Sequence, residues 1–289
     1  MEMMQEVCAL LRSNWGDEHP RVIGAYEELL SVAVFVYDLD VLVEVSHFLR
    51  AAAQELAGKG ELERACQLSL MSFPWLMEEE DVGVQKGIQE VQYYANLLDP
   101  DEHTEVVLSL CETLEAHEEE DRAHQLLTEL VQKFPQDEAV LYAFGCSALS
   151  QEKLEAAHDA LVQALSLRSE EEPEELTYLN YKIGQCLYRL EKYTSALQAF
   201  EAVLFAELEM YGEDSSELCM TYWSLAKTLS KLGRFEEAFR YRHQCWILEI
   251  EEQGIHCADT LQTASVLVKD CFAAHRFDRA QSVIRRSLD

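Results

Sequence analysis

Apolar residues recur along the chain at the three- and four-residue spacing that one face of an α-helix requires. Leu127, Leu161 and Phe200, for example, each follow an alanine by four residues. Only 11 Gly and 5 Pro interrupt the 289 residues, which favours helices joined by short turns. The pattern predicts an all-α protein with helices near residues 2–13, 20–37, 39–57, 61–77, 82–98, 102–116, 119–133, 136–149, 152–166, 174–190, 193–210, 215–231, 234–252, 257–274 and 277–288.

A short motif recurs at three of the predicted turns, where an aromatic residue is followed by two polar residues and an alanine. Two weaker copies lie earlier in the chain. The alanines that end the five copies are separated by 34, 39, 42 and 42 residues; they are Ala123, Ala157, Ala196, Ala238 and Ala280. Regular spacing of this kind indicates a repeated structural unit of two helices.

Each of these alanines has a small or medium partner twelve residues earlier, on the preceding predicted helix. The partners are Cys111, Gly145, Gly184, Ala226 and Val268. Small side chains on both sides allow two helices of a hairpin to approach closely where they cross. We therefore expect the alanines to be buried at helix–helix contacts.

The small, aromatic and alanine positions resemble the consensus of the tetratricopeptide repeat, and the 42-residue units resemble the longer repeats of the kinesin light chain type. The Gly-containing lead of that type is matched loosely at residues 211–217 and 254–261 and more closely at 16–20. The resemblance implies a right-handed α-solenoid of antiparallel helix hairpins. It indicates divergent helical repeats over residues 1–101 and a regular array over 102–289, in units of about 102–135, 136–173, 174–210, 215–252 and 257–289.

The excess of acidic over basic residues indicates which classes of molecule the protein can bind. With 54 acidic and 23 basic residues, the formal net charge is −31. The negative electrostatic field of such a chain repels nucleic acid and anionic lipid and favours basic partners. The alternative is that the negative charge serves only to keep the protein soluble. The nine scattered cysteines form no Cys-x-x-Cys pair, and the N-terminus is acidic, which together predict a reduced, cytoplasmic protein without membrane insertion.

No arrangement of residues predicts catalysis. The phosphate-binding, dinucleotide-binding, zinc-protease and nucleophile-elbow motifs are all absent. The acidic run at 117–121 is typical of a solvated turn, and the spacing of His243, Cys245, His256 and Cys257 matches no zinc site. We therefore predict a protein that is not an enzyme, with no catalytic residue, no metal and no cofactor.

The predicted register places basic and aromatic side chains together on the first helices of the C-terminal hairpins, which in tetratricopeptide folds line a concave groove. The candidate partner-binding residues are Tyr178, Tyr181, Lys182, Gln185, Tyr188, Arg189, Trp223, Lys227, Lys231, Lys269 and Phe272. Aromatic anchors beside cations suit a peptide that carries an acidic and an aromatic or apolar motif. The alternative is that several of the aromatic residues pack between hairpins as ordinary core.

The sequence therefore predicts a scaffold or adaptor that binds a protein or peptide ligand in this groove. Two alternatives are a dedicated chaperone for a secreted or membrane-active client and a peptide-sensing regulator, and the sequence is compatible with a homodimer. The carboxylate clamp of chaperone-binding tetratricopeptide domains requires Lys and Asn at fixed positions. Here residues such as Ser224 and Lys227 occupy the comparable places, with no Asn among them, so a ligand of that type is not expected.

Overall fold

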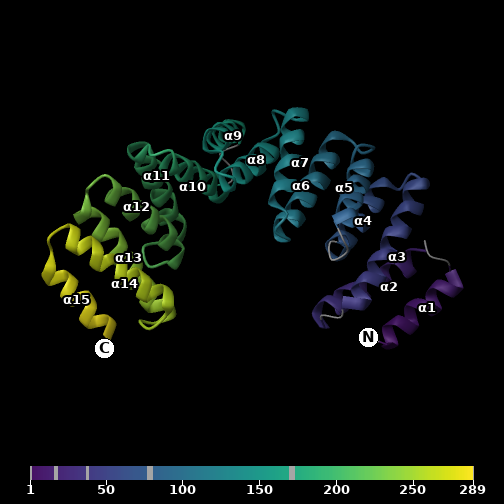
Figure 1. The fold of residues 1–289 in the computed structure, drawn as a ribbon, viewed down its shortest axis with the longest axis horizontal. Helices are drawn as coiled ribbons and strands as arrows, with labels where there is room; N and C mark the ends of the chain where they lie inside the picture. Colours follow the sequence, from purple (N-terminus) through teal and green to yellow (C-terminus); the bar gives the residue numbers. More distant parts are fainter. Residues whose placement is uncertain (1, 16–18, 37–38, 77–80, 169–172, 289) are drawn as a thin grey trace. The chain divides into compact units, whose positions relative to one another are not determined.

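The computed structural model describes residues 2–15, 19–36, 39–76, 81–168 and 173–288. Within these ranges the regular elements are all helices, as predicted (Figure 1). The chain divides into two compact units, Met1–Pro135 and Gln136–Asp289, called here the N-terminal and C-terminal units. None of the helices in the described part of the chain combines the length and apolar character needed to cross a bilayer.

The N-terminal unit is built from seven helices within the described residues, and helices that follow one another in the chain pack together. Its core includes Tyr26 of α2 stacked on Phe48 of α3, with ring centroids 3.7 Å apart. The helices are α1 (Glu2–Trp15), α2 (Pro20–Val36), α3 (Leu39–Gly58), α4 (Leu62–Leu76), α5 (Asp81–Ala95), α6 (Pro100–Ala116) and α7 (Glu120–Lys133). The predicted lead at 16–20 lies largely outside the described residues.

The described residues of the C-terminal unit form four helix hairpins, in each of which a first helix packs against the second helix that follows it. Figure 1 shows α12 to α15 side by side in this order. The helices are α8 (Glu138–Ser150), α9 (Leu154–Leu167), α10 (Pro173–Arg189), α11 (Tyr193–Tyr211), α12 (Cys219–Lys231), α13 (Phe235–Gln253), α14 (Ala258–Ala273) and α15 (Phe277–Leu288).

The predicted helix boundaries are confirmed to within a few residues. The largest difference is at the predicted helix 215–231, which starts with a separate 3-10 turn at Ser216–Leu218 before α12 begins. The side chain of Ser215 accepts a hydrogen bond from the backbone N–H of Glu217 and so starts this turn. The turn places Glu217 and Cys219 at a cavity between α12, α13 and the start of α14.

The crossing alanines are buried in all five hairpins, which confirms the predicted repeat register. Close approach is most evident at two glycines. A Cβ atom added at Gly145 would lie 2.6 Å from the Leu161 side chain, and one at Gly184 would lie 2.7 Å from the Phe200 ring. Each glycine therefore leaves space for an apolar side chain of the second helix.

Each of these five hairpins uses the same turn. The backbone N–H of the last residue before the second helix donates a hydrogen bond to the carbonyl five residues earlier. Lys192, for example, donates to Leu187 at 2.9 Å. The residue before it has positive φ, which is 59° at Glu191 and 74° at Gly233. This is the Schellman arrangement, which satisfies the free carbonyls at the end of the first helix.

The compact units and the predicted repeats divide the chain differently. The sequence separates divergent repeats over 1–101 from regular units that begin at 102, whereas the hairpin of α6 and α7 belongs to the N-terminal compact unit. The compact units are defined by contacts between residues, whereas the predicted boundary near residue 101 is defined by how regular the repeats are. The two divisions describe different properties, so the boundary near residue 101 stays a prediction.

Candidate functional site

The first helices of the C-terminal unit are joined to one another by hydrogen bonds between side chains one repeat apart. The Tyr181 hydroxyl of α10 lies 2.9 Å from the Ser224 hydroxyl of α12. The Trp223 indole N–H of α12 donates to the Thr263 hydroxyl of α14 at 3.3 Å. These links fix the spacing of the helices on which the predicted binding residues lie.

The predicted basic residues on α10 lie among aromatic groups and backbone carbonyls. The Lys182 ammonium is 5.0 Å from the centre of the Tyr178 ring, and Tyr178 in turn contacts Tyr142 of α8. The Arg189 guanidinium donates to the backbone carbonyl of Leu149 at 2.7 Å, so part of its hydrogen-bonding capacity is already used.

A small cavity lies between α10 and α12. The Lys227 ammonium is 4.8 Å from the centre of the Tyr188 ring, a cation–π contact across two repeats. The cavity has a volume of about 200 Å³ and is lined by Gln185, Tyr188, Arg189, Phe200, Ser224 and Lys227. Four of the predicted residues are thus brought together at one opening.

The remaining predicted residues differ in accessibility. Tyr178 is 52% exposed and Phe272 is likewise exposed, as are Lys231 and Lys269. Tyr181 is only 8% exposed, because its ring packs on Phe200. The expectation that the aromatic side chains share one exposed groove is therefore wrong for Tyr181, which forms part of the core.

Two further cavities occupy equivalent positions in consecutive repeats. The first, of about 200 Å³, lies between α10, α11 and the start of α12; the second, of about 400 Å³, lies between α12, α13 and the start of α14. Adding 42 to the number of every residue that lines the first cavity gives a residue that lines the second. The first cavity is lined by Glu174, Thr177, Tyr178, Tyr181, Glu207, Met210, Tyr211, Glu217, Met220 and Thr221.

A glutamate of the second helix lines the inner part of each cavity. Glu249 is 8% exposed, and one of its carboxylate oxygens accepts a hydrogen bond from the Thr263 hydroxyl at 3.0 Å. Glu207 accepts in the same way from Thr221, also at 3.0 Å. The second carboxylate oxygen of each glutamate is buried and has no hydrogen-bond partner within the described ranges.

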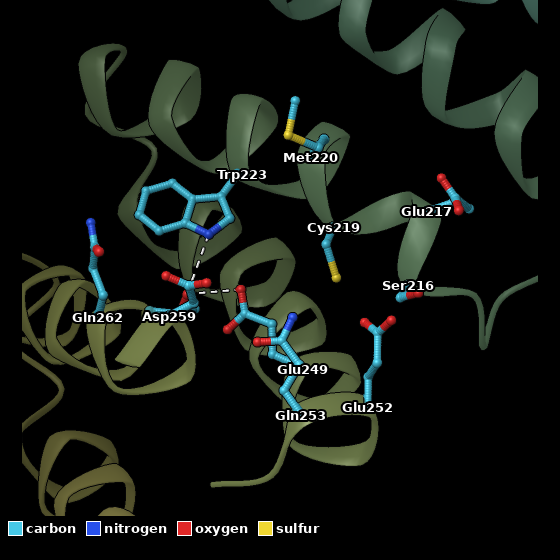
Figure 2. Close-up of a pocket in the computed structure, with 11 residues that line it drawn as sticks. Ser216, Glu217, Cys219, Met220, Trp223, Glu249, Glu252, Gln253, Asp259 and Gln262 are labelled. Carbon is cyan, nitrogen blue, oxygen red and sulfur yellow. Dashed lines mark hydrogen bonds between the residues drawn. The ribbon is translucent and has the colours of Figure 1, made fainter. Parts of the chain in front are cut away.

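Figure 2 shows the second cavity, with Glu249 and Trp223 among the residues that line it. Hydrogen bonds run from Trp223 through Thr263 to Glu249, and Glu252 points from α13 toward Ser216. Trp223 is held on one face by Arg242, whose guanidinium carbon is 4.3 Å from the centre of the indole ring. The aromatic wall of the cavity is therefore fixed by neighbouring groups.

Negative charge converges on the first cavity as well. Partial desolvation raises the pKa of the Tyr211 phenol, and the carboxylates of Glu174, Glu217 and Glu207 raise it further. Burial also raises the pKa of Glu207, while its hydrogen bond from Thr221 acts in the opposite direction. A positive charge placed in this cavity would relieve both effects.

Glu207 and Glu249 were not predicted from the sequence as site residues. A glutamate carries little information in a chain with 54 acidic residues. The signal that would have found them is the repeat itself, since each glutamate is followed by a threonine fourteen residues later and the two pairs lie 42 residues apart.

No protein-family model matches the sequence, and no curated protein matches it. Among solved structures, MamA from residue 41 to its end, from Desulfovibrio magneticus RS-1, is 16% identical and superposes with a TM-score of 0.50, covering 64% of this chain and 92% of that one. A variant form of a putative kinesin light chain with nearly identical TPR-like repeats, from Podosopora anserina, is 14% identical with a TM-score of 0.50, covering 71% of this chain and 94% of that one.

At these identities the similarity bears on the fold alone, and it agrees with the buried alanines and the repeated turns. The chain therefore has the tetratricopeptide-type fold, an all-helical repeat solenoid.

Proposed function

We propose that this protein is an interaction scaffold whose C-terminal unit binds a segment of a partner protein along its first helices. The observation that carries the proposal is the cluster of Lys227, Tyr188 and Arg189 around one small cavity in a strongly acidic chain. Cations and aromatic rings at one opening supply donors for a carboxylate and apolar area for a side chain. The preferred ligand is a segment with an acidic and an aromatic or apolar residue.

An adaptor role fits this surface better than a chaperone role does. The cavity next to Lys227 has room for one side chain, and its walls are polar as well as aromatic. A chaperone for a membrane-active client would need a larger continuous apolar surface. A peptide-sensing regulator would use the same groove and would differ only in its response to binding.

The proposal is tested by reversing two charges at the groove. Affinity capture from native lysate identifies a partner, and calorimetry with that purified partner then measures affinity. The double variant Lys227→Glu/Lys231→Glu is expected to weaken binding by at least about 1–2 kcal/mol, because it removes donors and adds repulsion. Helicity measured by circular dichroism should not change, since both lysines are exposed.

The matched control reverses two exposed lysines at hairpin turns of the same unit, Lys153→Glu/Lys192→Glu. This control changes the net charge by the same amount as the groove variant, but at positions that do not line the cavity. Equal affinities of the groove variant and the wild type would disprove the groove assignment, and equal losses in both variants would show that only the overall field matters.

A further inference from the structure

The two equivalent acidic cavities are a repeated feature that the lysine-containing groove does not explain. Each combines a glutamate on the second helix, half-buried at Glu207 and buried at Glu249, with an aromatic side chain on the first helix. A further carboxylate lies at the rim of each, Glu217 in the first cavity and Asp259 in the second. Glu249 lies 42 residues after Glu207, and Asp259 lies 42 residues after Glu217. The two cavities are therefore copies of one site in consecutive repeats.

Neither glutamate forms an ion pair with another side chain in the described part of the chain. Glu249 is more than nine-tenths buried and forms no ion pair there; its hydrogen bonds come from Thr263 and, at 3.3 Å, from the Cys245 thiol. None of the described residues donates to its second oxygen. Leaving a buried carboxylate without a full set of donors costs free energy, so the site gains stability from any cation that reaches it.

The walls of the cavity favour an alkyl ammonium or guanidinium group over a metal ion. Among the described residues no group of three or more His, Cys, Asp or Glu side chains is arranged to hold a metal. The second cavity is instead flanked by Trp223 and Met220, which offer apolar contact to an aliphatic stem. A lysine or arginine side chain has such a stem with a cationic end.

We infer that the two cavities each bind a lysine or arginine side chain of one partner segment, with the charge directed at Glu207 in the first and Glu249 in the second. This inference rests on the proposed scaffold function, because it requires that the first helices of the C-terminal unit bind a polypeptide. It adds a basic motif to the acidic and aromatic motif proposed for the groove near Lys227. The acidic cavities lie toward the starts of α10 and α12, whereas Arg189, Lys227 and Lys231 lie toward the ends of these helices.

The repeat also sets the spacing of the two basic residues. The helices that carry the aromatic side chains of the two cavities, α10 and α12, are in contact through Tyr181 and Ser224, and helices in contact lie about 8–10 Å apart. In a polyproline II segment, side chains three residues apart share a face and are separated by about 9 Å. A ligand with two basic residues at that separation can therefore fill both cavities at once.

The test uses the full chain and a fluorescein-labelled peptide, Gly-Ser-Lys-Pro-Pro-Lys-Ser-Gly, measured by fluorescence anisotropy at physiological salt. The double variant Glu207→Gln/Glu249→Gln is expected to bind about tenfold or more weakly than the wild type, because the carboxylate in each cavity is lost. The matched control is Glu209→Gln/Glu251→Gln, which removes two exposed carboxylates on the same helices, also 42 residues apart. It should change affinity by about twofold or less.

A second pair of substitutions avoids any effect on the core. Glu217→Gln/Asp259→Asn alters only exposed rim carboxylates and is expected to weaken peptide binding by about threefold or more. Equal losses in the cavity and control variants would overturn the inference, as would an absence of saturable binding to the wild type. Tighter binding of free spermidine than of the peptide would overturn the assignment to a polypeptide.

The same peptide separates this inference from the proposed groove. Lys227→Glu/Lys231→Glu leaves both acidic cavities intact, so peptide binding should persist in that variant even if the groove assignment is wrong. Conversely, a partner that depends on Lys227 but not on Glu207 or Glu249 would retain the scaffold function and disprove the acidic cavities as binding sites.

Discussion

Arg242 and Asp270 form a buried ion pair that joins α13 to α14, with the guanidinium Nε 2.7 Å from a carboxylate oxygen. Arg242 is only 2% exposed. The other oxygen of Asp270 accepts a hydrogen bond from the Ser230 hydroxyl at 3.3 Å. Because the same guanidinium lies over the Trp223 ring, the pair supports one wall of the second acidic cavity.

Removing one partner of this pair should destabilise the protein strongly. Asp270→Ala leaves a buried guanidinium without its counter-charge, which is expected to cost about 3–5 kcal/mol in the free energy of unfolding. One repeat earlier, the equivalent positions hold Phe200 and Thr228. The double substitution Arg242→Phe/Asp270→Thr should therefore recover most of the loss, as measured by denaturant unfolding followed by circular dichroism.

The exposed Asp278 provides the control for the ion pair. Asp278→Ala removes the same charge and should have little effect, because the carboxylate is solvated. If Asp270→Ala were no worse than Asp278→Ala, the buried pair would not contribute as argued.

The hairpin crossing at Ala196 predicts a second stability effect. Ala196→Leu adds three carbon atoms where α11 packs on α10, and overpacking of this kind costs about 1–3 kcal/mol. Ala202→Leu, at an exposed position of the same helix, is the matched control and should leave the thermal midpoint nearly unchanged. Equal midpoints for the Ala196 and Ala202 variants would show that the repeat register is wrong.

Most of the fold could be predicted from the sequence because its determinants are local and periodic. The crossing alanines recur at regular intervals, and all five are buried where the two helices of a hairpin cross. Arg242 is the exception. It occupies the apolar position that Phe200 fills one repeat earlier, and only the contact with Asp270, 28 residues away, explains why a charge is tolerated there.

The candidate site was harder to predict because accessibility depends on neighbouring repeats. A helical register placed Tyr178 and Tyr181 on one face, yet the packing of α10 against α12 and α11 buries Tyr181 and leaves Tyr178 exposed. Glu207 and Glu249 appear in sequence as ordinary acidic residues of amphipathic helices. Their burial results from tertiary packing, which composition and spacing do not specify.

The repeated turn predicts a stabilising substitution. Glu191 adopts a φ of 59°, a left-handed conformation that favours glycine, and the equivalent position in the next hairpin is Gly233. Glu191→Gly is expected to raise the free energy of unfolding by about 0.5–1 kcal/mol, because strain at the Cβ atom is relieved. Gly233→Ala should produce a loss of similar size in thermal unfolding, and a loss in Glu191→Gly would contradict this account of the turn.

The raised pKa of Glu207 predicts a stability cost that depends on pH. Burial is its main cause, the Glu217 charge adds to it, and the Thr221 hydrogen bond opposes it. Between the ordinary pKa of 4.5 and the higher folded value, the folded chain holds a proton that the unfolded chain has released. Stability therefore falls as pH rises through this window, and the cost of the charged form persists at neutral pH.

Glu207→Gln removes this cost and should raise the thermal midpoint at pH 7 relative to the wild type. The advantage should shrink as the pH approaches 4.5 and below, where Glu207 is protonated in both states. The exposed Glu209→Gln provides a control with no such trend, and an advantage that stays constant down to about pH 4 would refute the argument. A cation bound at the carboxylate supplies the same stabilisation, so the lysine peptide should raise the midpoint of the wild type more than that of Glu207→Gln/Glu249→Gln.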